Sequence, residues 1–313
     1  MEVIETIELP VPQPYDADGV FAFLAARAVD GVELVERSEA TFRYVRTLAL
    51  PGGPGLIDVV HDGDVLRVTA HAAAAADVTP AVRLVIALFD LDHDAVVADL
   101  LLADDPALAK LVATTPGVCV PGAVDPHELV VRALVGQQIS VAAARTHLGR
   151  LAQFCGTPCP TTVDGVDRLF PSAASIAASV TVPPPGKEPL DPNRPLRLPR
   201  RSIGHLVSTT AALADGSLQV ATDMEASELH AALIARPGIG EWTAAYLAMR
   251  VLHDSDAWLT GDVALVAGAR RLGIIDDSIP TAKAHRPLAE HASRWSPYRA
   301  YAAMHLWRIA AQG

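Results

Sequence analysis

Apolar and polar residues alternate in several segments of the first third of the chain, as they do in strands that bury one face. Two other stretches, residues 16–28 and 79–89, have apolar residues at helical spacing. The segment His61-Asp-Gly-Asp64 predicts a two-residue hairpin turn, because Asp-Gly tolerates positive φ. We therefore expect an α+β domain over residues 1–100, with an antiparallel sheet and two helices. The predicted strands are residues 3–9, 42–50, 55–60 and 65–69.

From residue 90 onward strand signals fade, and helical spacing dominates the rest of the chain. We expect a central helical domain over residues 122–255. A second helical part should combine residues 101–121 with residues 256–313. Seven prolines within residues 181–201 exclude regular structure, so we expect a Pro-rich surface insertion, with a basic loop that contacts a nucleic-acid backbone as the alternative. The predicted helices include residues 95–102, 106–113, 126–135, 141–154, 203–214 and 263–272.

One segment between two apolar helical stretches, Pro237-Gly-Ile-Gly240, breaks the helical pattern. Two glycines two residues apart permit a tight reversal of the chain. The amides of Gly238, Gly240 and the following helical turn, up to Thr243, would then point outward beside Ile239. They would lie at the positive end of a helix dipole, a setting that suits a phosphate oxygen but carries no sequence information. We interpret the segment as a DNA-binding helix-hairpin-helix; a glycine-rich turn between packed helices is the alternative.

Asp262 follows Trp258-Leu-Thr-Gly261 and directly precedes an apolar helix. An Asp in this position is commonly an N-cap, whose side chain bonds the first amides of the helix. The positive end of the helix dipole also keeps the carboxylate ionised. An ionised carboxylate suits a reaction in which a sugar becomes cationic. From this residue alone, both interpretations stay open.

The formal net charge of −11 looks unfavourable for a nucleic-acid partner. However, residues 1–120 carry −12, whereas residues 121–313 carry +1. The excess of acidic residues thus lies in the part of the sequence that does not contain the predicted hairpin. The negative net charge of the whole chain therefore does not exclude DNA binding. Three cysteines are too few for a disulfide framework, and they exclude a four-cysteine iron–sulfur cluster.

Several segments along the chain, taken in their order, carry further information about its family. They are Pro14-Tyr-Asp16, Phe23-Leu-Ala-Ala-Arg-Ala28, Arg132-Ala-Leu-Val-Gly-Gln137, Ser140-Val-Ala142, Gly238-Ile-Gly-Glu-Trp-Thr243, Trp295-Ser-Pro-Tyr-Arg-Ala-Tyr301 and His305-Leu-Trp307. In this order they resemble the AlkA-type 3-methyladenine DNA glycosylases of the helix-hairpin-helix superfamily. The resemblance runs over nearly the whole chain. Arg236 stands where the superfamily's hairpin usually has Leu.

The resemblance implies that an all-α helix-hairpin-helix glycosylase core follows the sheet domain, and that Asp262 is catalytic. A carboxylate near C1′ would stabilise the oxocarbenium-like cation and orient the attacking water. Relatives with lyase activity carry a nucleophilic lysine two residues after the second hairpin glycine. Here that position is Trp242, which has no amine to form a Schiff base. We therefore predict monofunctional hydrolysis that leaves an abasic site.

Four aromatic residues are candidates for a base pocket. Trp242 and Tyr246 lie four residues apart, on one face of the predicted helix. Phe23 and Trp307 match pocket positions that the resemblance implies. Electron-rich rings would hold an electron-poor alkylated base by stacking and cation–π attraction. Packing in the core is the alternative for all four.

A base that leaves the duplex leaves a gap that a side chain must fill. The resemblance implies an apolar wedge in the loop after Gly-Gln, whereas here the loop carries Gln137 and Gln138, with Gln138 at the wedge position. An exposed loop glutamine without this role is the alternative. Gly261 and Val263 are further departures, at positions where relatives have an acid or an aromatic residue. Both would widen the pocket.

These features predict a monofunctional base-excision-repair glycosylase for alkylated purines of the 3-methyladenine and 7-methylguanine class. Two alternatives stay open: a non-catalytic helix-hairpin-helix protein that binds lesion DNA, and a glycosylase for deaminated or oxidised bases. We expect a monomer whose partner is double-stranded DNA. No organic cofactor is implied, although a monovalent cation at the hairpin backbone near Gly238 and Gly240 is expected. The N-terminus lacks a signal-peptide pattern and the apolar runs are short, so we expect no membrane association and a cytoplasmic location.

Overall fold

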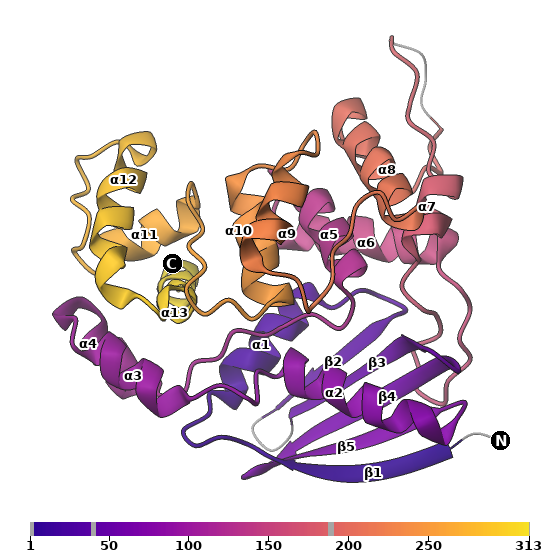
Figure 1. Cartoon of the computed structure of the whole chain (residues 1–313), viewed down its shortest axis with the longest axis horizontal. Coiled ribbons are helices and arrows are strands. Elements are labelled where there is room, and N and C mark those ends of the chain that lie inside the picture. The colour runs from indigo at the N-terminus through magenta and orange to yellow at the C-terminus, as the bar shows by residue number, and fades with distance from the viewer. Residues whose placement is uncertain (1–2, 39–41, 187–190, 313) are drawn as a thin grey trace.

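The computed structural model describes residues 3–38, 42–186 and 191–312. Its N-terminal part is a five-stranded antiparallel sheet with strand order β1-β5-β4-β3-β2, at the bottom of Figure 1. Helices follow the sheet, so the predicted α+β architecture is confirmed. The strands are β1 (Val3–Pro10), β2 (Glu33–Arg37), β3 (Phe42–Leu50), β4 (Gly53–Asp62) and β5 (Val65–Ala72).

Two details of the sheet differ from the sequence prediction. β2 has no counterpart among the predicted strands, because its sequence does not alternate apolar and polar residues. Its first residue, Glu33, is buried by ion pairs rather than by hydrophobicity. In the predicted hairpin, Asp62 pairs with Val65, so the two turn residues are Gly63 and Asp64. Gly63 has a φ of 61°, which a two-residue hairpin turn requires at this position.

The helices α1 (Ala17–Arg27) and α2 (Val78–Leu88) pack on one face of the sheet, with the short η1 (Ala75–Asp77) leading into α2. Phe89, just after α2, joins the layers: its ring centroid lies 5.3 Å from Phe21 of α1 and 5.9 Å from Tyr44 of β3. On the opposite face, Val45 and Leu56 are covered by Val166 from the helical region. One face of the sheet is therefore covered by the domain's own helices and the other by a residue of the helical region.

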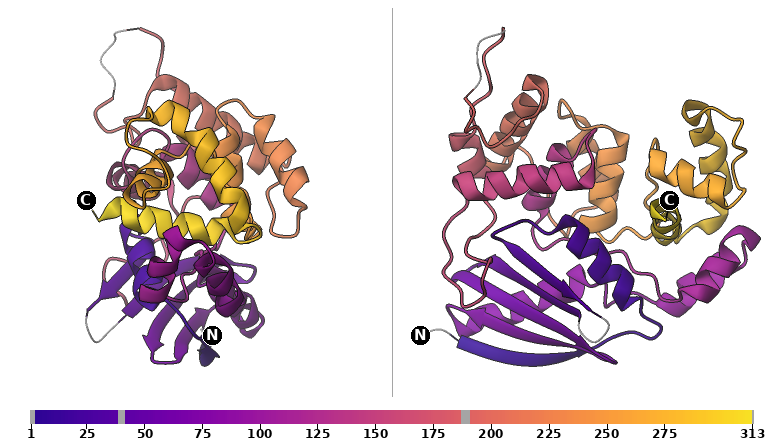
Figure 2. Two further views of the ribbon diagram at one scale, coloured as in Figure 1. Left: turned by 90° about the vertical axis from the view of Figure 1, so that its left-hand side faces the viewer. Right: turned by 180° about the vertical axis from the view of Figure 1, so that it is seen from behind.

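The remaining helices form two groups, as the opposite views of Figures 1 and 2 show. Asp105, the N-cap of α4 (Pro106–Thr114), accepts hydrogen bonds from His291 Nε2 at 2.7 Å and Trp295 Nε1 at 2.9 Å. These bonds tie α4 to the C-terminal helices. The first group is α5 (Pro126–Val135), α6 (Val141–Cys155), α7 (Ala173–Ser179), α8 (Arg200–Ala214), α9 (Ala226–Ile234) and α10 (Glu241–Val251). The second is α3 (Ala95–Ala103), α4 (Pro106–Thr114), α11 (Val263–Arg271), α12 (Thr281–Ala292), η2 (Ser293–Trp295) and α13 (Arg299–Ala311).

The Pro-rich insertion joins α7 to α8. Its described residues, 181–186 and 191–199, lie outside helices and strands, while residues 187–190 lie outside the described part of the chain. α8 begins at Arg200, three residues before the predicted start, so Arg200 and Arg201 belong to the helix. In the part of the chain that the structure describes, no helix is long and apolar enough to cross a bilayer.

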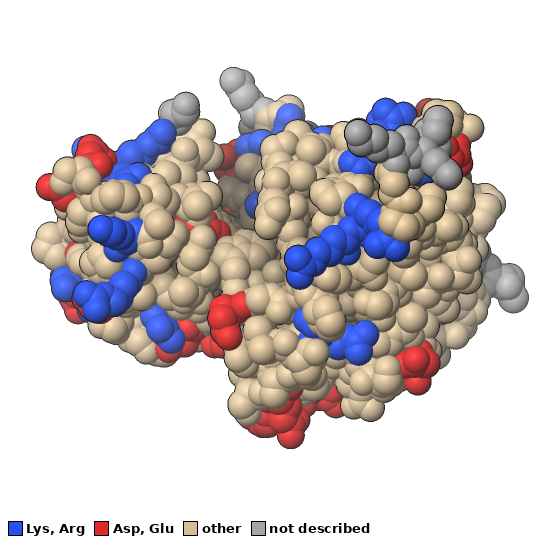
Figure 3. All heavy atoms as spheres, turned by 90° about the horizontal axis from the view of Figure 1, so that it is seen from above, with Lys and Arg blue, Asp and Glu red and all other residues tan. Residues whose placement is uncertain are grey.

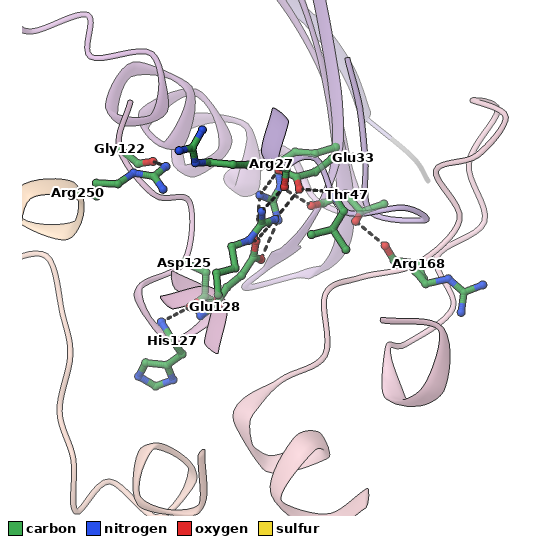
Figure 4. Close-up of polar contacts among 12 residues, drawn as sticks. Arg27, Glu33, Thr47, Gly122, Asp125, His127, Glu128, Arg168 and Arg250 are labelled. Atoms are coloured by element: carbon green, nitrogen blue, oxygen red, sulfur yellow. Dashed lines mark hydrogen bonds and ion pairs between the residues drawn. The ribbon is translucent and has the colours of Figure 1, made fainter. Parts of the chain in front are cut away.

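A buried network of four charged residues joins the sheet to α5 (Figure 4). Arg46 of β3 contacts Glu128 of α5 at 2.9 Å and Glu33 of β2 at 3.4 Å. Arg132 of α5 contacts Glu33 at 2.5 Å and Glu128 at 2.6 Å, and the Tyr44 hydroxyl donates to Glu33 at 2.7 Å. Each charge therefore has two opposite neighbours, which offsets the large cost of burying it.

The pKa of Glu33 reflects this arrangement. Burial alone would raise the pKa of the carboxyl, but the guanidinium groups of Arg132 and Arg46 outweigh burial and lower the pKa from 4.5 to about 2. Glu33 therefore stays ionised in the folded protein under conditions in which it would already take up protons in the unfolded chain.

The network should contribute strongly to stability. Glu128→Gln removes one carboxylate and leaves Arg46 without its closest counter-charge, so we expect a loss of about 3–5 kcal/mol in the free energy of unfolding. The midpoint of urea unfolding at neutral pH measures it. The control is Glu8→Gln, which removes an exposed partner of Arg67 and should cost less than about 1 kcal/mol. Equal losses in the two variants would contradict a stabilising role for the network.

Stability should also fall in acid through Glu33. A depressed pKa contributes stability that is present above the unfolded value of 4.5 and is lost as the pH falls toward about 2. We expect the free energy of unfolding to fall between pH 5 and pH 2.5 more steeply in the wild-type protein than in Glu33→Gln. The difference should approach about 3 kcal/mol. Urea titrations at a series of pH values measure it, and parallel curves for the two proteins would contradict the assignment.

Candidate active site

A cavity of about 1180 Å³ lies between the two helical groups and reaches α1 of the N-terminal domain. Figure 3 shows the surface hollowed between a smaller lobe on the left and a larger body on the right. The cavity brings together Phe23 from α1, Gln138 from the α5–α6 loop, Trp242 from α10, Asp262 before α11 and Trp307 from α13. Gln137, Gly238, Gly240, Thr243 and Tyr246 also line it. Of the predicted site residues, Ile239 alone is outside the cavity wall.

The hairpin between α9 and α10 is built around Gly238. This residue has a φ of 90°, and a Cβ there would collide with the ring of His205 on α8, so neither the backbone nor the space admits a side chain. Within the described residues, the amides of Gly238, Gly240 and Thr243 donate no hydrogen bond to the protein. Three donors are therefore free at the positive end of α10.

The side chains of two predicted phosphate-contact residues are turned inward. Ile239 is buried, and the Thr243 hydroxyl accepts a hydrogen bond from Gln137 Nε2 at 3.2 Å. At the hairpin, Thr243 therefore offers only its amide to a ligand. The Ile239 amide already donates to the carbonyl of Arg236 at 3.2 Å, so Ile239 offers only its carbonyl. The sequence pattern cannot show this distinction, because it does not reveal which side of the turn faces the core.

The two glutamines of the α5–α6 loop point in different directions. Gln137 Nε2 also donates to the carbonyl of Gly238 at 2.9 Å, so this side chain ties the loop to the hairpin. Gln138 is exposed, lines the cavity and has a φ of 60°, an uncommon conformation for a residue with a side chain. Gln138 is therefore the glutamine that projects freely at the mouth of the cavity.

Asp262 uses its two carboxylate oxygens differently. Oδ1 accepts hydrogen bonds from the amides of Ala264 at 2.7 Å and Leu265 at 3.0 Å, so Asp262 is the N-cap of α11. Oδ2 accepts from the indole nitrogens of Trp242 at 2.9 Å and Trp307 at 3.2 Å. The N-cap interpretation is thus confirmed. It does not exclude the other interpretation, because a second oxygen of the same carboxylate lies among the cavity's tryptophans.

The four predicted pocket aromatics lie in one cavity, but with different surroundings. Trp242 stacks on Tyr246 with ring centroids 5.1 Å apart and an angle of 11° between the planes. Trp307 is half-buried, whereas Phe23 and Tyr246 are largely buried. Packing alone does not account for the two tryptophans, because their N–H groups fix the Asp262 carboxylate.

Two arginines complete the floor of the cavity, and neither was predicted from the sequence. Arg250 donates to the carbonyls of Pro121 and Gly122 at 2.7 and 2.6 Å and to the Tyr246 hydroxyl at 2.7 Å. The guanidinium carbon of Arg27 lies 3.7 Å from the ring centroid of Phe23, and that of Arg250 lies 4.9 Å from it. A phenylalanine ring is therefore in contact with two cations.

These arginines could have been found from their spacing. Arg27 follows Phe23 by four residues, and Arg250 follows Tyr246 by four residues, so each pair lies on one helix face. Their charges also act on the Tyr246 hydroxyl: burial alone would raise the pKa of Tyr246, but Arg250 and Arg27 outweigh burial and lower it. The two guanidinium groups thus dominate the surroundings of the Tyr246 hydroxyl.

The sequence and the fold are similar to those of known proteins. Residues 6–125 match a family model described as the AlkA N-terminal domain. DNA-3-methyladenine glycosylase 2 of Escherichia coli (strain K12) is 30% identical over 300 residues, covering 94% of each chain. A 3-methyladenine DNA-glycosylase from Archaeoglobus fulgidus has the same fold, with a TM-score of 0.77 at 16% identity, over 98% of this chain and 99% of that one.

A longer relative is the probable bifunctional transcriptional activator/DNA repair enzyme AlkA of Mycobacterium tuberculosis (strain H37Rv). It is 35% identical over 302 residues, or 96% of this chain. The match covers 56% of that relative, so the chain spans about half of its length. The match to the relative from Escherichia coli, in contrast, covers 94% of that relative. On this similarity, the chain belongs to the AlkA family of DNA-3-methyladenine glycosylases.

Proposed function

We propose that this chain is a monofunctional DNA glycosylase, which flips an alkylated purine out of duplex DNA and hydrolyses its N-glycosidic bond. One observation carries the proposal. Asp262 has one oxygen held on the N-terminus of α11 and the other held by two indole N–H groups in the wall of a large cavity. A carboxylate held in a fixed orientation stabilises a positive charge that develops beside it without having to reorganise first.

In the proposed reaction the C1′–N bond breaks, and its electron pair leaves with the base. The sugar becomes an oxocarbenium-like cation, which the Asp262 carboxylate stabilises electrostatically. Water adds to C1′ and loses a proton, and an abasic site results. Trp242 and Trp307 keep the carboxylate from rotating, so little reorganisation is needed as charge develops. Stacking on Trp242 would hold the departing base.

Contact with the DNA backbone is proposed at the hairpin. The free amides of Gly238, Gly240 and Thr243, at the positive end of α10, suit one phosphate group. Lys and Arg side chains lie on both lobes beside the hollow in Figure 3, which favours a polyanion there despite the net charge of −11. A monovalent cation bound by hairpin carbonyls stays part of the proposal. The Gly238 carbonyl already accepts from Gln137, which leaves one lone pair for such an ion.

Gln138 is proposed to enter the gap that the base leaves. It is exposed at the mouth of the cavity, and its neighbour Gln137 anchors the loop to the hairpin. A phosphate held by the hairpin would therefore set the position of the wedge residue as well. A glutamine can hydrogen-bond to the unpaired base of the opposite strand, which an apolar wedge cannot do.

Asp262→Asn tests the assignment of the carboxylate. Asn still caps a helix, so the fold should be kept, while the loss of charge should slow single-turnover excision of 7-methylguanine by about 100-fold or more. Binding to a duplex with an abasic-site analogue should be retained within a few-fold. Asp94→Asn is the control: Asp94 caps α3 outside the cavity, and its variant should excise normally. If the wild-type protein binds lesion DNA but excises nothing, it is a binding protein and not an enzyme.

The absence of lyase chemistry is a separate prediction. The cavity has no lysine among its described residues, and the position of the nucleophilic lysine in lyase relatives is Trp242. We expect no strand breaks until the product is treated with alkali, and no borohydride-trapped covalent complex with the DNA. Trp242→Lys provides a matched comparison for the trapping assay. Borohydride trapping by the wild-type protein would show that another amine acts as the nucleophile.

A further inference from the structure

Three exposed arginines at the end of the Pro-rich insertion and the start of α8 take no part in the proposed reaction. They are Arg197, Arg200 and Arg201. In the part of the chain that the structure describes, none of them lies within ion-pair distance of a carboxylate. Arg197 and Arg200 donate instead to backbone carbonyls, at 3.2 and 2.7 Å. The positive charge of these side chains is therefore uncompensated in the free protein.

The insertion is held in place at this end. Leu196 is buried, and the amide of Arg197 donates to Nδ1 of His147 on α6 at 3.4 Å. Burial lowers the pKa of His147, and the nearby charges of Arg150 and Arg197 lower it further. Arg150 of α6, which is also exposed, therefore lies close enough to add its charge to the same surface.

The start of α8 concentrates this charge. Its N-cap is Pro199, which makes no side-chain cap, and its first turn holds Arg200 and Arg201 but no acidic residue. Cations at the positive end of a helix dipole are electrostatically unfavourable. Sequences break a local rule of this kind chiefly at functional sites. An anion bound beside the first turn of α8 would remove the unfavourable interaction.

The start of α8 and the DNA-binding hairpin belong to one continuous surface. The ring of His205, one turn after Arg201, lies directly against Gly238, and Arg236 Nη2 donates to the carbonyl of Ser208 at 3.0 Å. Arg201 and Ser208 are two helical turns apart, about 10 Å along the axis, which is about three steps of a DNA strand. In Figure 3, which views the molecule from above, Lys and Arg side chains form a band across the larger body.

We propose that this insertion surface, made of Arg150, Arg197, Arg200 and Arg201, binds the phosphate backbone of duplex DNA on one side of the lesion, beyond the phosphate at the hairpin. This inference rests on the proposed function, since it extends the DNA contact of the same site. A guanidinium presents two parallel donors that match the oxygens of a phosphate, and such contacts need no particular base sequence. Continuity with the hairpin favours DNA over an acidic protein as the partner.

The double variant Arg197→Gln/Arg201→Gln tests the contact. We expect its affinity for a long duplex with an abasic-site analogue to fall by about tenfold or more at physiological salt. The slope of log Kd against log salt concentration should fall in magnitude by about 0.9 for each lost phosphate contact, or about 2 in total. Arg83→Gln is the matched control, because Arg83 is an exposed arginine of α2, in the sheet domain. Its affinity and slope should equal those of the wild-type protein.

A second comparison uses duplexes shortened to a few base pairs on one side of the lesion or on the other. Shortening the flank that the insertion surface contacts should weaken the wild-type protein and remove its advantage over the double variant. Shortening the opposite flank should leave that advantage intact. Equal binding of the two proteins to one shortened duplex also shows that the double variant is folded.

The inference is wrong if the double variant binds the long duplex with the wild-type affinity and salt slope, as it would if the insertion surface bound an acidic protein. It is also wrong if shortening either flank has the same effect on the difference between the two proteins. If the wild-type protein excises no base from any lesion duplex, the proposed function itself fails. The two failures are distinguishable, because the salt dependence of binding is measured without catalysis.

Discussion

Two indole N–H groups converge on a single oxygen of Asp262, and the architecture of the cavity depends on this arrangement. Trp242 belongs to α10 and Trp307 to α13, while Asp262 begins α11, so one carboxylate connects three helices from both helical groups. Its other oxygen is fixed by the first amides of α11. The carboxylate therefore has a defined orientation before any ligand arrives, which is the condition for electrostatic stabilisation without reorganisation.

The sequence predicts those features that depend on local pattern. Alternation located four of the five strands, helical spacing located most helices, and the glycines located the hairpin, where Gly238 has the expected positive φ. β2 was missed because Glu33 is buried by charge, and charge pairing between distant residues leaves no periodic signal. The inward turn of the Ile239 and Thr243 side chains depends on packing and on Gln137, which the pattern also cannot show.

Within the cavity, too, the sequence pattern does not show which side chains contact one another. Trp242 and Tyr246 were paired by their helical spacing, Phe23 and Trp307 were added by the resemblance, and the structure brings all four into one cavity. That both tryptophans donate to Asp262 follows only from the three-dimensional arrangement. The arginines at the cavity floor were overlooked because an arginine at the end of a helix is ordinarily a solvated, dipole-compensating residue.

The proposed catalytic carboxylate and the floor of the cavity come from opposite ends of the chain. Asp262 and its tryptophans lie in the last quarter of the sequence, whereas Phe23 and the guanidinium stacked on it lie in the first helix of the sheet domain. The buried network between β2, β3 and α5 holds the sheet domain against the first helical group. On the proposed function, the carboxylate and the aromatic floor therefore belong to separately folded parts of the chain, so substitutions in α1 are expected to reshape the cavity floor while Asp262 and its two tryptophans keep their arrangement.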